Sequence, residues 1–215
     1  MVMGPNLKHK IQSIKPQKKR RDRFTVILES GDVFGISGDV LLSNPLYHGQ
    51  NLTTKELDHV KQIENQQKIK IKILNYLSYR ERSKEELRNA LKNKGYTESE
   101  IEPVLTELES KGYLNDKSFT IMYATYLINK KLLGRKSVIS KFYQHKIPDD
   151  ILSPILDDLY RTYPIEKGIK LIIEKRISVR GNSLKEKKNL VNLLFRKGYS
   201  WADIEHQINE NDWVK

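Results

Sequence analysis

The sequence of 215 residues contains no cysteine, and this absence excludes several classes of protein. Without thiols the chain forms no disulfide scaffold, no thiolate metal site and no cysteine nucleophile. Long hydrophobic runs are also missing, since the longest largely apolar stretch, Ile121 to Ile128, is far too short to span a bilayer. The chain does not open with a basic segment, an apolar core and a cleavage site. We therefore expect a cytoplasmic protein without membrane association.

Residue patterns typical of catalysis or metal binding are also scarce. The histidines are His9, His48, His59, His145 and His206. They show no i,i+4 pairing and no HExxH motif, so they do not predict a metal site. The acidic pairs at 149–150 and 157–158 fall near the N-terminus and on the face of an expected helix, where carboxylates complement the helix dipole or face solvent. We predict no enzyme activity, no catalytic residue, no metal and no cofactor.

Positive charge is abundant and unevenly placed. Charged residues make up 31% of the chain and the formal net charge is +12, which favours nucleic acid or a nucleoprotein as partner. Residues 1–23 hold eight Lys or Arg against one Asp and few bulky apolar side chains, so we predict a flexible basic arm. This arm is either a solubilising tail or a tether to DNA phosphates. The candidate tether residues are Lys18, Lys19, Arg20, Arg21 and Arg23.

Residues 24–67 predict a short β-hairpin followed by a helix. Apolar residues alternate over 24–28, a Ser-Gly-Asp turn follows at 30–32, and a second apolar run covers 33–36. A two-stranded hairpin is barely stable alone, so it must pack against a neighbouring segment. Thr53 and Glu56 form a capping box that opens the helix.

The remainder repeats with a period of about 50 residues. The repeat is aligned on three anchor positions, Gly95, Lys146 and Gly198, which are 51 and 52 residues apart. The apolar residues that recur eight and four before and six and ten after the anchors are Leu87, Leu91, Ile101 and Leu105, then Val138, Phe142, Leu152 and Leu156, then Leu190, Leu194, Ile204 and Ile208. We infer a tandem repeat protein.

Each repeat predicts three helices. Glycine in the left-handed conformation ends the helices that precede Gly95 and Gly112, while Pro148 and Ser200 stand at helix starts. We therefore predict a mainly α fold, an elongated array of three three-helix repeats with a short N-terminal β-hairpin extension. The predicted parts are the arm 1–23, the extension 24–67 and the repeats 68–115, 116–163 and 164–215.

Motifs in these repeats resemble the bacterial regulatory protein RecX family. The stretch Ser83-Lys-Glu-Glu86-Leu87, followed by Lys94-Gly95, matches the family's S-x-x-E-L…K-G helix. Gly112-Tyr-Leu-Asn-Asp116 with Phe119 is similar to its G-Y-L-D-D-x-x-F motif. The resemblance covers residues 68–215, and the extension is similar to that of longer members. The departures from the family pattern are Asn115, Thr120, Lys141 and the segment 145–147.

This resemblance implies a regulator that acts without chemistry of its own. RecX proteins bind the RecA recombinase, dock along its nucleoprotein filament on single-stranded DNA, and usually inhibit filament growth, ATP hydrolysis and strand exchange. The resemblance therefore implies a role in homologous recombination, DNA repair and the SOS response, with RecA as partner and with possible weak direct DNA contact. We also expect a monomer. Inhibition and stimulation of RecA both remain open.

The charges of the repeats suggest a contact surface. The second helices, placed at 83–94, 134–146 and 184–197, are basic, whereas the third helices, at 97–112, 148–161 and 200–212, are acidic. Stacked repeats would align the basic helices into a stripe suited to an acidic groove or to DNA. The alternative is that the two kinds of helix simply attract each other. The candidate contact residues are Lys84, Arg88, Lys92, Arg135, Lys136, Lys141, Lys185, Lys188, Arg196 and Lys197.

A DNA-binding helix-turn-helix protein is the main rival interpretation. Residues 83–114 have two capped helices joined by a short glycine turn. In that motif the later helix enters the major groove, but here the later helix would present Glu98, Glu102 and Glu109 to phosphates. Base-specific reading by the third helices is therefore disfavoured, while nonspecific DNA contact by the second helices and the arm stays open. Most aromatic residues are expected in the core rather than on base-stacking platforms.

Overall fold

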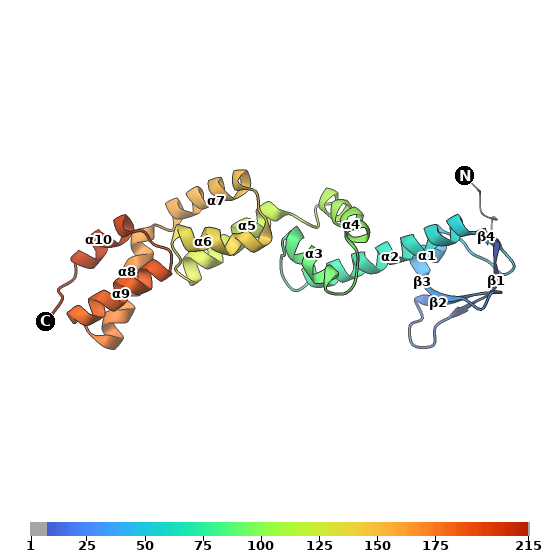
Figure 1. Cartoon of the computed structure of the whole chain (residues 1–215), viewed down its shortest axis with the longest axis horizontal. Helices are drawn as coiled ribbons and strands as arrows, with labels where there is room; N and C mark the ends of the chain where they lie inside the picture. The colour runs from blue at the N-terminus through green and yellow to red at the C-terminus, as the bar shows by residue number, and fades with distance from the viewer. Residues whose placement is uncertain (1–7, 215) are drawn as a thin grey trace, which may run out of the picture. The chain divides into compact units, whose positions relative to one another are not determined.

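The computed structural model describes residues 8–214 and is mainly helical, with helix over 63% of the chain. Contacts divide it into two units, one of residues up to 78 together with 91–108, the other of residues 79–90 together with those from 109 onward. The elements (Figure 1) are, in chain order, β1 Lys8–Pro16, β2 Arg23–Leu28, β3 Val33–Ser37, α1 Gly38–Ser43, β4 Asn51–Thr53, α2 Thr54–Leu77, α3 Lys84–Lys92, α4 Glu98–Ser110, α5 Asp116–Thr125, a π-helical turn Tyr126–Lys130, α6 Arg135–Phe142, a 3-10 turn Tyr143–His145, α7 Asp149–Thr162, α8 Ile165–Arg180, α9 Leu184–Arg196 and α10 Trp201–Asn209.

The first unit begins with a four-stranded antiparallel sheet in the order β3-β2-β1-β4. The predicted hairpin is present as β2 and β3, with Val26 opposite Phe34. Strands β1 and β4 extend the sheet on the β2 side, so the hairpin has the neighbouring strands that an isolated hairpin lacks. One face of the sheet packs against α1 and α2. The core residues there are Ile11, Val26, Leu28, Ile36, Val40, Leu52, Leu57 and Val60.

The predicted flexible arm is wrong for residues 8–16. Residues 8–16 form β1, which pairs with β4 through Lys8–Lys10 and with β2 from Ile11 onward. Ile11 is fully buried and Ile14 packs against the same core. Because β1 has partners on both sides, its backbone groups find hydrogen bonds despite its polar composition. Residues 1–7 of the predicted arm lie outside the described residues.

Helix α2 crosses the predicted boundary between residues 67 and 68. Its start is the expected capping box, in which Thr53 and Glu56 exchange hydrogen bonds. Leu57 and Val60 pack into the core of the sheet, whereas Ile69 and Ile73, also fully buried, lie further along the same helix. One uninterrupted helix therefore serves both the extension and the first predicted repeat. A break at 67 would leave helical backbone groups without partners.

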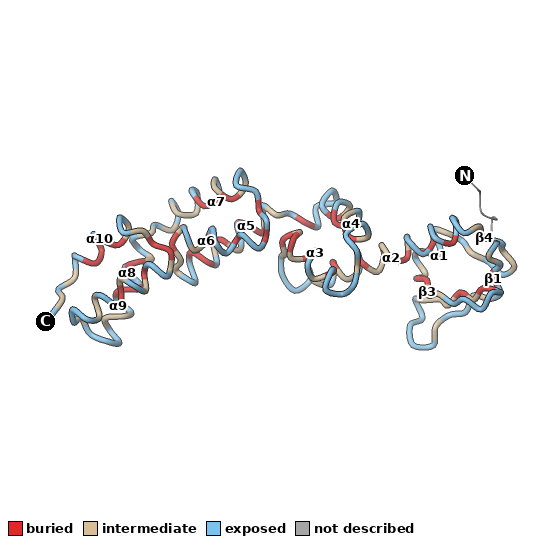
Figure 2. Tube along the Cα trace, in the orientation of Figure 1, coloured by how far each residue is buried: buried red, intermediate tan, exposed pale blue. Residues whose placement is uncertain are grey.

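The predicted tandem repeat is confirmed by burial and by backbone conformation. All twelve apolar side chains at the recurring offsets have a relative exposure of 3% or less. The anchors Gly95, Lys146 and Gly198 have φ angles of +87°, +50° and +87°. The left-handed conformation thus recurs at the same place in each repeat, even where lysine replaces glycine. Figure 2 shows buried positions distributed along every helical segment rather than gathered in one centre.

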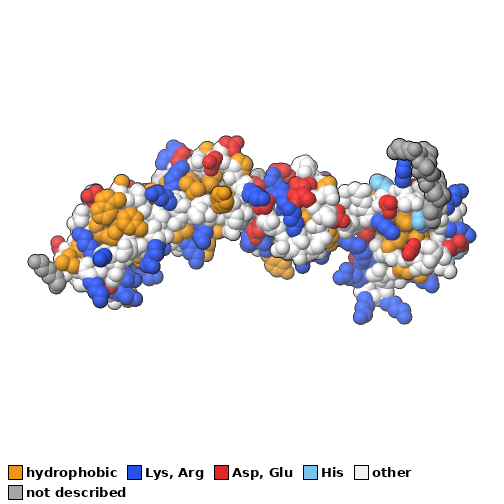
Figure 3. Space-filling model, viewed as in Figure 1, with side chains coloured by type: hydrophobic (Ala, Val, Ile, Leu, Met, Phe, Trp, Pro, Cys, Tyr) orange, Lys and Arg blue, Asp and Glu red, His pale blue; other side chains and the backbone are white. Residues whose placement is uncertain are grey.

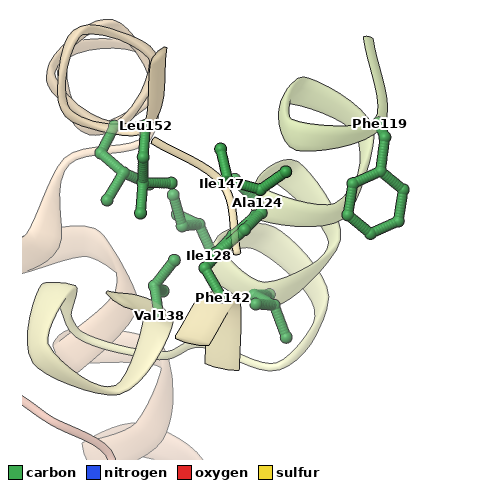
Figure 4. Packing of buried hydrophobic residues seen from close by; sticks show 9 residues of the cluster. Phe119, Ala124, Ile128, Val138, Phe142, Ile147 and Leu152 are labelled. Carbon is green, nitrogen blue, oxygen red and sulfur yellow. The ribbon is translucent and has the colours of Figure 1, made fainter. Parts of the chain in front are cut away.

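The second unit has two apolar clusters, one for each group of three helices. Figure 4 shows side chains of α5, α6 and α7 converging around Ala124, Ile128 and Phe142. The other cluster joins α8, α9 and α10 through Ile169, Leu190, Leu194, Ile204 and Ile208. At its end the Trp213 indole donates to the Ile208 carbonyl at 2.7 Å. Each group closes its own small core, as expected for a repeat protein.

Candidate functional site

The second helices, α3, α6 and α9, carry most of the predicted contact residues, and we call their basic side chains the second-helix surface. Capping fixes where these helices begin. Ser83 accepts from the Glu86 backbone and Ser183 from the Glu186 backbone, while Gly134 occupies the N-cap of α6. The apolar residues eight and four positions before each anchor are buried, so one side of each second helix faces the core. The polar side is left outward, which is where the lysines and arginines lie.

Equivalent contacts join these helices end to end within the second unit. Near the start of α3, the Ser83 hydroxyl hydrogen-bonds His145 Nδ1 at 2.9 Å, and Glu85 pairs with Lys146 at 2.8 Å. At the start of α6, Gly134 N–H donates to the Lys197 carbonyl at 2.9 Å. Ser83 and Gly134 are equivalent in the repeat, and so are His145 and Lys197. The end of each later second helix thus meets the start of the preceding one.

The joint between α6 and α9 is close enough to require glycine on both sides. A Cβ on Gly134 would lie 2.6 Å from the backbone nitrogen of Tyr199, and a Cβ on Gly198 would collide with Ser137. Lys197 is held here as well, because its ammonium donates to the Lys131 carbonyl at 2.7 Å. Burial lowers the pKa of Lys197. This predicted contact residue therefore belongs to the joint between repeats.

Four of the predicted contact residues pair with acids. Lys84 of α3 reaches Glu109 of α4 at 2.8 Å, and Arg135 of α6 reaches Asp157 of α7 at 2.6 Å. The other two pairs are Lys92 with Glu98 and Arg88 with Glu85. Three of these pairs connect a basic second helix to the acidic third helix of its own repeat. The alternative of mutual attraction therefore accounts for this part of the pattern.

Five predicted contact residues remain exposed with no ion pair among the described residues. They are Lys136 and Lys141 on α6 and Lys185, Lys188 and Arg196 on α9. Figure 3 shows Lys and Arg side chains gathered around the region where Figure 1 places α8 and α9. Since α6 and α9 meet at the glycine joint, their unpaired cations belong to one connected part of the second unit. These five carry positive charge that no acid of the described residues neutralises.

The predicted tether residues separate into two groups. Lys18, Lys19, Arg20 and Arg21 are exposed in the loop between β1 and β2. Arg23 is different, because it reaches the buried Glu64 carboxylate at 2.6 Å, and Glu64 also accepts from the Ser37 backbone at 2.8 Å. Removing one partner of such a buried pair typically costs about 3–5 kcal/mol. Arg23 therefore joins the sheet to α2 instead of serving as a tether.

A pocket of about 630 Å³ opens beside the Ser83–His145 contact. Phe119, Tyr123 and Tyr126 line it, and the imidazole of His145 packs 4.8 Å from the Phe119 ring centre. The pKa of His145 is lowered, chiefly because burial penalises the charged imidazole. The sequence pattern does not distinguish this histidine from the other four. Its helix-end position gave no sign that the preceding repeat would cover it.

One pair of exposed aromatic residues also differs from expectation. The rings of Phe195 and Trp201 stack with centres 6.3 Å apart, yet their relative exposures are 46% and 48%. The sequence places Phe195 at the end of one helix and Trp201 at the start of the next. The spacing of residues along a helix does not predict how exposed a side chain is at the turn between two helices.

Within residues 8–214 no cluster of three or more His, Asp or Glu side chains is arranged to hold a metal ion. No helix in the described part of the chain combines the length and apolar character needed to cross a membrane.

Comparisons with known proteins agree with the motifs in the repeats. Residues 70–108 match the family model for RecX, first three-helix domain. The regulatory protein RecX of Bacillus cereus (strain B4264) is 29% identical over 205 residues, covering 93% of this chain and 76% of the relative. The regulatory protein RecX of Listeria monocytogenes serotype 4a (strain HCC23) is 27% identical over 194 residues, covering 89% of this chain and 71% of that protein.

Solved structures of RecX proteins have a similar fold. A crystal structure of regulatory protein RecX has a TM-score of 0.72 at 23% identity, covering 94% of this chain and all of that one, which shows a shared fold. The crystal structure of RecX from Lactobacillus salivarius has a TM-score of 0.59 at 25% identity, covering 69% of this chain and 97% of the other. The repeat, its motifs and these matches agree that the chain is similar to regulatory protein RecX over most of its length.

Proposed function

We propose that this protein regulates the RecA recombinase by binding its nucleoprotein filament through the unpaired cations of α6 and α9. The observation that carries the proposal is the split within the second-helix surface. Several of its cations are neutralised inside the protein, whereas Lys136, Lys141, Lys185, Lys188 and Arg196 have no internal partner. Among the described residues these five charges form no ion pair that would stabilise the fold. Even a paired surface charge contributes only about 0–1 kcal/mol, so stability does not explain why five cations lie on two joined helices.

A filament on DNA is a suitable partner for such a surface. Acidic protein groups and phosphates repeat at regular intervals along the filament. The joint at Gly134 and Gly198 holds α6 and α9 in a fixed relation, so their cations meet a repeating partner with little ordering cost. Exposed charges of this kind chiefly accelerate association and set orientation.

Regulation then follows from differential binding. A protein that binds one filament state more tightly than another shifts the equilibrium toward that state, and it needs no catalytic group to do so. We propose that the bound protein opposes filament growth and thereby lowers RecA's ATP hydrolysis and strand exchange. Its action would be that of a modulator in recombination and DNA repair.

The test is RecA's ATP hydrolysis on single-stranded DNA while this protein is titrated from well below the RecA concentration. A fall at substoichiometric ratios is expected, because one bound molecule would disable many subunits by stopping growth. A fall only when the protein approaches the DNA concentration would instead indicate competition for DNA. No change at any ratio, with RecA from the same source, would contradict the proposal.

A further inference from the structure

We propose that the third repeat carries a binding site for single-stranded nucleic acid, formed by the aromatic pair Phe195 and Trp201 together with Arg196 and Asn192. This site shares Arg196 with the surface proposed above to bind the RecA filament, but the inference does not depend on that proposal. Four observations carry the inference: the exposed stacked rings, the recess next to them, the unpaired polar groups in that recess, and the absence of such a pair from the other repeats.

The aromatic pair is not needed to hold the repeat together. Phe195 and Trp201 lie three residues before and three after the anchor Gly198. The equivalent residues of the first repeat are Lys92 and Glu98, which form an ion pair across the same corner. An ordinary surface pair therefore suffices to join a second helix to a third helix. Two large rings exposed by nearly half at this corner point instead to a ligand that covers them.

A recess of about 550 Å³ adjoins Phe195, and its walls are polar. Arg176, Asn189, Asn192 and Arg196 complete its lining. The one carboxylate of α9, Glu186, is already engaged, since Arg176 Nε lies 3.1 Å from it and the Asn189 amide donates to it at 3.0 Å. The Asn192 amide and the Arg196 guanidinium have no side-chain partner among the described residues. The recess is thus open to an anion and to hydrogen-bonding groups.

A row of amide and cationic side chains continues from this recess along one face of α9. Lys185, Asn189, Asn192 and Arg196 recur every three or four residues, so their side chains lie in one row. At about 1.5 Å per residue the row is about 16 Å long. A partner that matches it must carry negative charge for the cations at the two ends of the row and hydrogen-bonding groups for the asparagines between them. It must also present flat apolar faces at the end with the aromatic pair.

Single-stranded nucleic acid combines these properties. Its unpaired bases stack on aromatic side chains and its phosphates bind lysine and arginine, while amide side chains hydrogen-bond exposed base edges. A duplex lacks accessible base faces and would use only the cations. An acidic peptide would pair with the cations and leave the two aromatic faces in water. The chemistry therefore favours an unpaired strand of DNA or RNA.

Trp201 itself supplies the first measurement. The chain has two tryptophans, so Trp213→Phe leaves Trp201 as the sole indole reporter. Stacking of a base should quench its fluorescence when oligothymidylate or oligouridylate is added, and comparison of the two separates DNA from RNA. Heparin should bind the cations without this quenching. Quenching by heparin equal to that by the oligonucleotides would overturn the proposal, as would no quenching by either oligonucleotide.

A second measurement separates stacking from folding. Phe195→Lys combined with Trp201→Glu transplants the ion pair of the first repeat, so the corner stays joined and the net charge stays the same. We expect unchanged helicity and an affinity for labelled oligothymidylate reduced at least about tenfold, since each stacked base contributes that much. Tyr143→Ala is the matched control, because Tyr143 is the equivalent of Phe195 in the second repeat and is 89% exposed. It should bind like wild type.

Two results would contradict this assignment. Wild-type affinity of the double variant for oligothymidylate would show that the rings contribute nothing to nucleic-acid binding. Unchanged oligonucleotide binding together with weakened binding to the RecA filament would make the aromatic pair a protein contact. Because the oligonucleotide assay contains no RecA, failure of the regulatory proposal would leave its result unaffected.

Discussion

At the residue scale, the anchor positions link the sequence most directly to the structure. The alignment on Gly95, Lys146 and Gly198 predicted equivalent places in three repeats, and all three have positive φ angles. The apolar residues at fixed offsets from them are buried for the same reason, because a fixed backbone path turns the same positions inward. What the spacing could not predict is the space around each anchor, which depends on the neighbouring repeat.

Gly95 and Gly198 therefore form a matched pair for mutation. Gly95→Ala should destabilise the protein by about 1–2 kcal/mol, since only the left-handed conformation is penalised and no atom lies within 4 Å of the added Cβ. Gly198→Ala should lose about 1–3 kcal/mol more, because the Cβ also collides with Ser137. Urea unfolding of both variants measures the difference. Equal losses would show that the close approach of Gly198 to Ser137 is absent in solution.

At the element scale, strand β1 and the joints between helices could not be predicted from the sequence. The segment 8–16 has only two inward apolar residues, Ile11 and Ile14, among lysines and other polar residues, so its composition indicated a flexible arm. Its pairing with both β2 and β4 is a long-range property that composition does not encode. The opposite charges of the second and third helices predict that they attract each other. The particular ion pairs, however, follow only from the packing of those helices.

The joint between α3 and α6 makes stability depend on pH. His145 is buried there against Ser83, with Glu86, Arg80 and Asp116 near enough to influence its charge. Its pKa lies below the ordinary 6.5, so the unfolded chain takes up this proton at a higher pH than the folded chain. The stabilisation is therefore complete above pH 6.5 and is lost as the pH falls toward the lowered pKa of the folded state.

Replacing this imidazole should flatten that dependence. We expect the free energy of unfolding of His145→Gln to vary less than that of wild type between about pH 7 and pH 5, the range in which histidine titrates. His59→Gln, at an exposed position on α2, serves as the control and should keep the wild-type slope. Denaturant unfolding at several pH values measures both. Identical slopes for His145→Gln and wild type would contradict a buried neutral imidazole at the joint.

At the scale of the whole molecule, the basic side chains of the second helices fall into two groups, those that bind within the protein and those that have no partner in the described part of the chain. The sequence predicted ten contact residues on the second helices from charge segregation alone. Lys84, Lys92 and Arg135 pair with their own third helices, and Lys197 joins two repeats. The sequence alone does not show which lysines are paired inside the protein and which are left for another protein, because this depends on how the helices pack. The five unpaired cations are the part left for a partner.

The most direct test of the account is the affinity for RecA filaments on single-stranded DNA of two charge-reversed variants. Lys136→Glu with Lys188→Glu alters the unpaired second-helix surface, while Lys167→Glu with Lys175→Glu makes the same charge change at exposed positions on α8. We predict about a tenfold or greater loss for the first variant only, because attraction becomes repulsion at the contact. Equal affinities of the two variants would contradict the central claim that α6 and α9 form the contact surface.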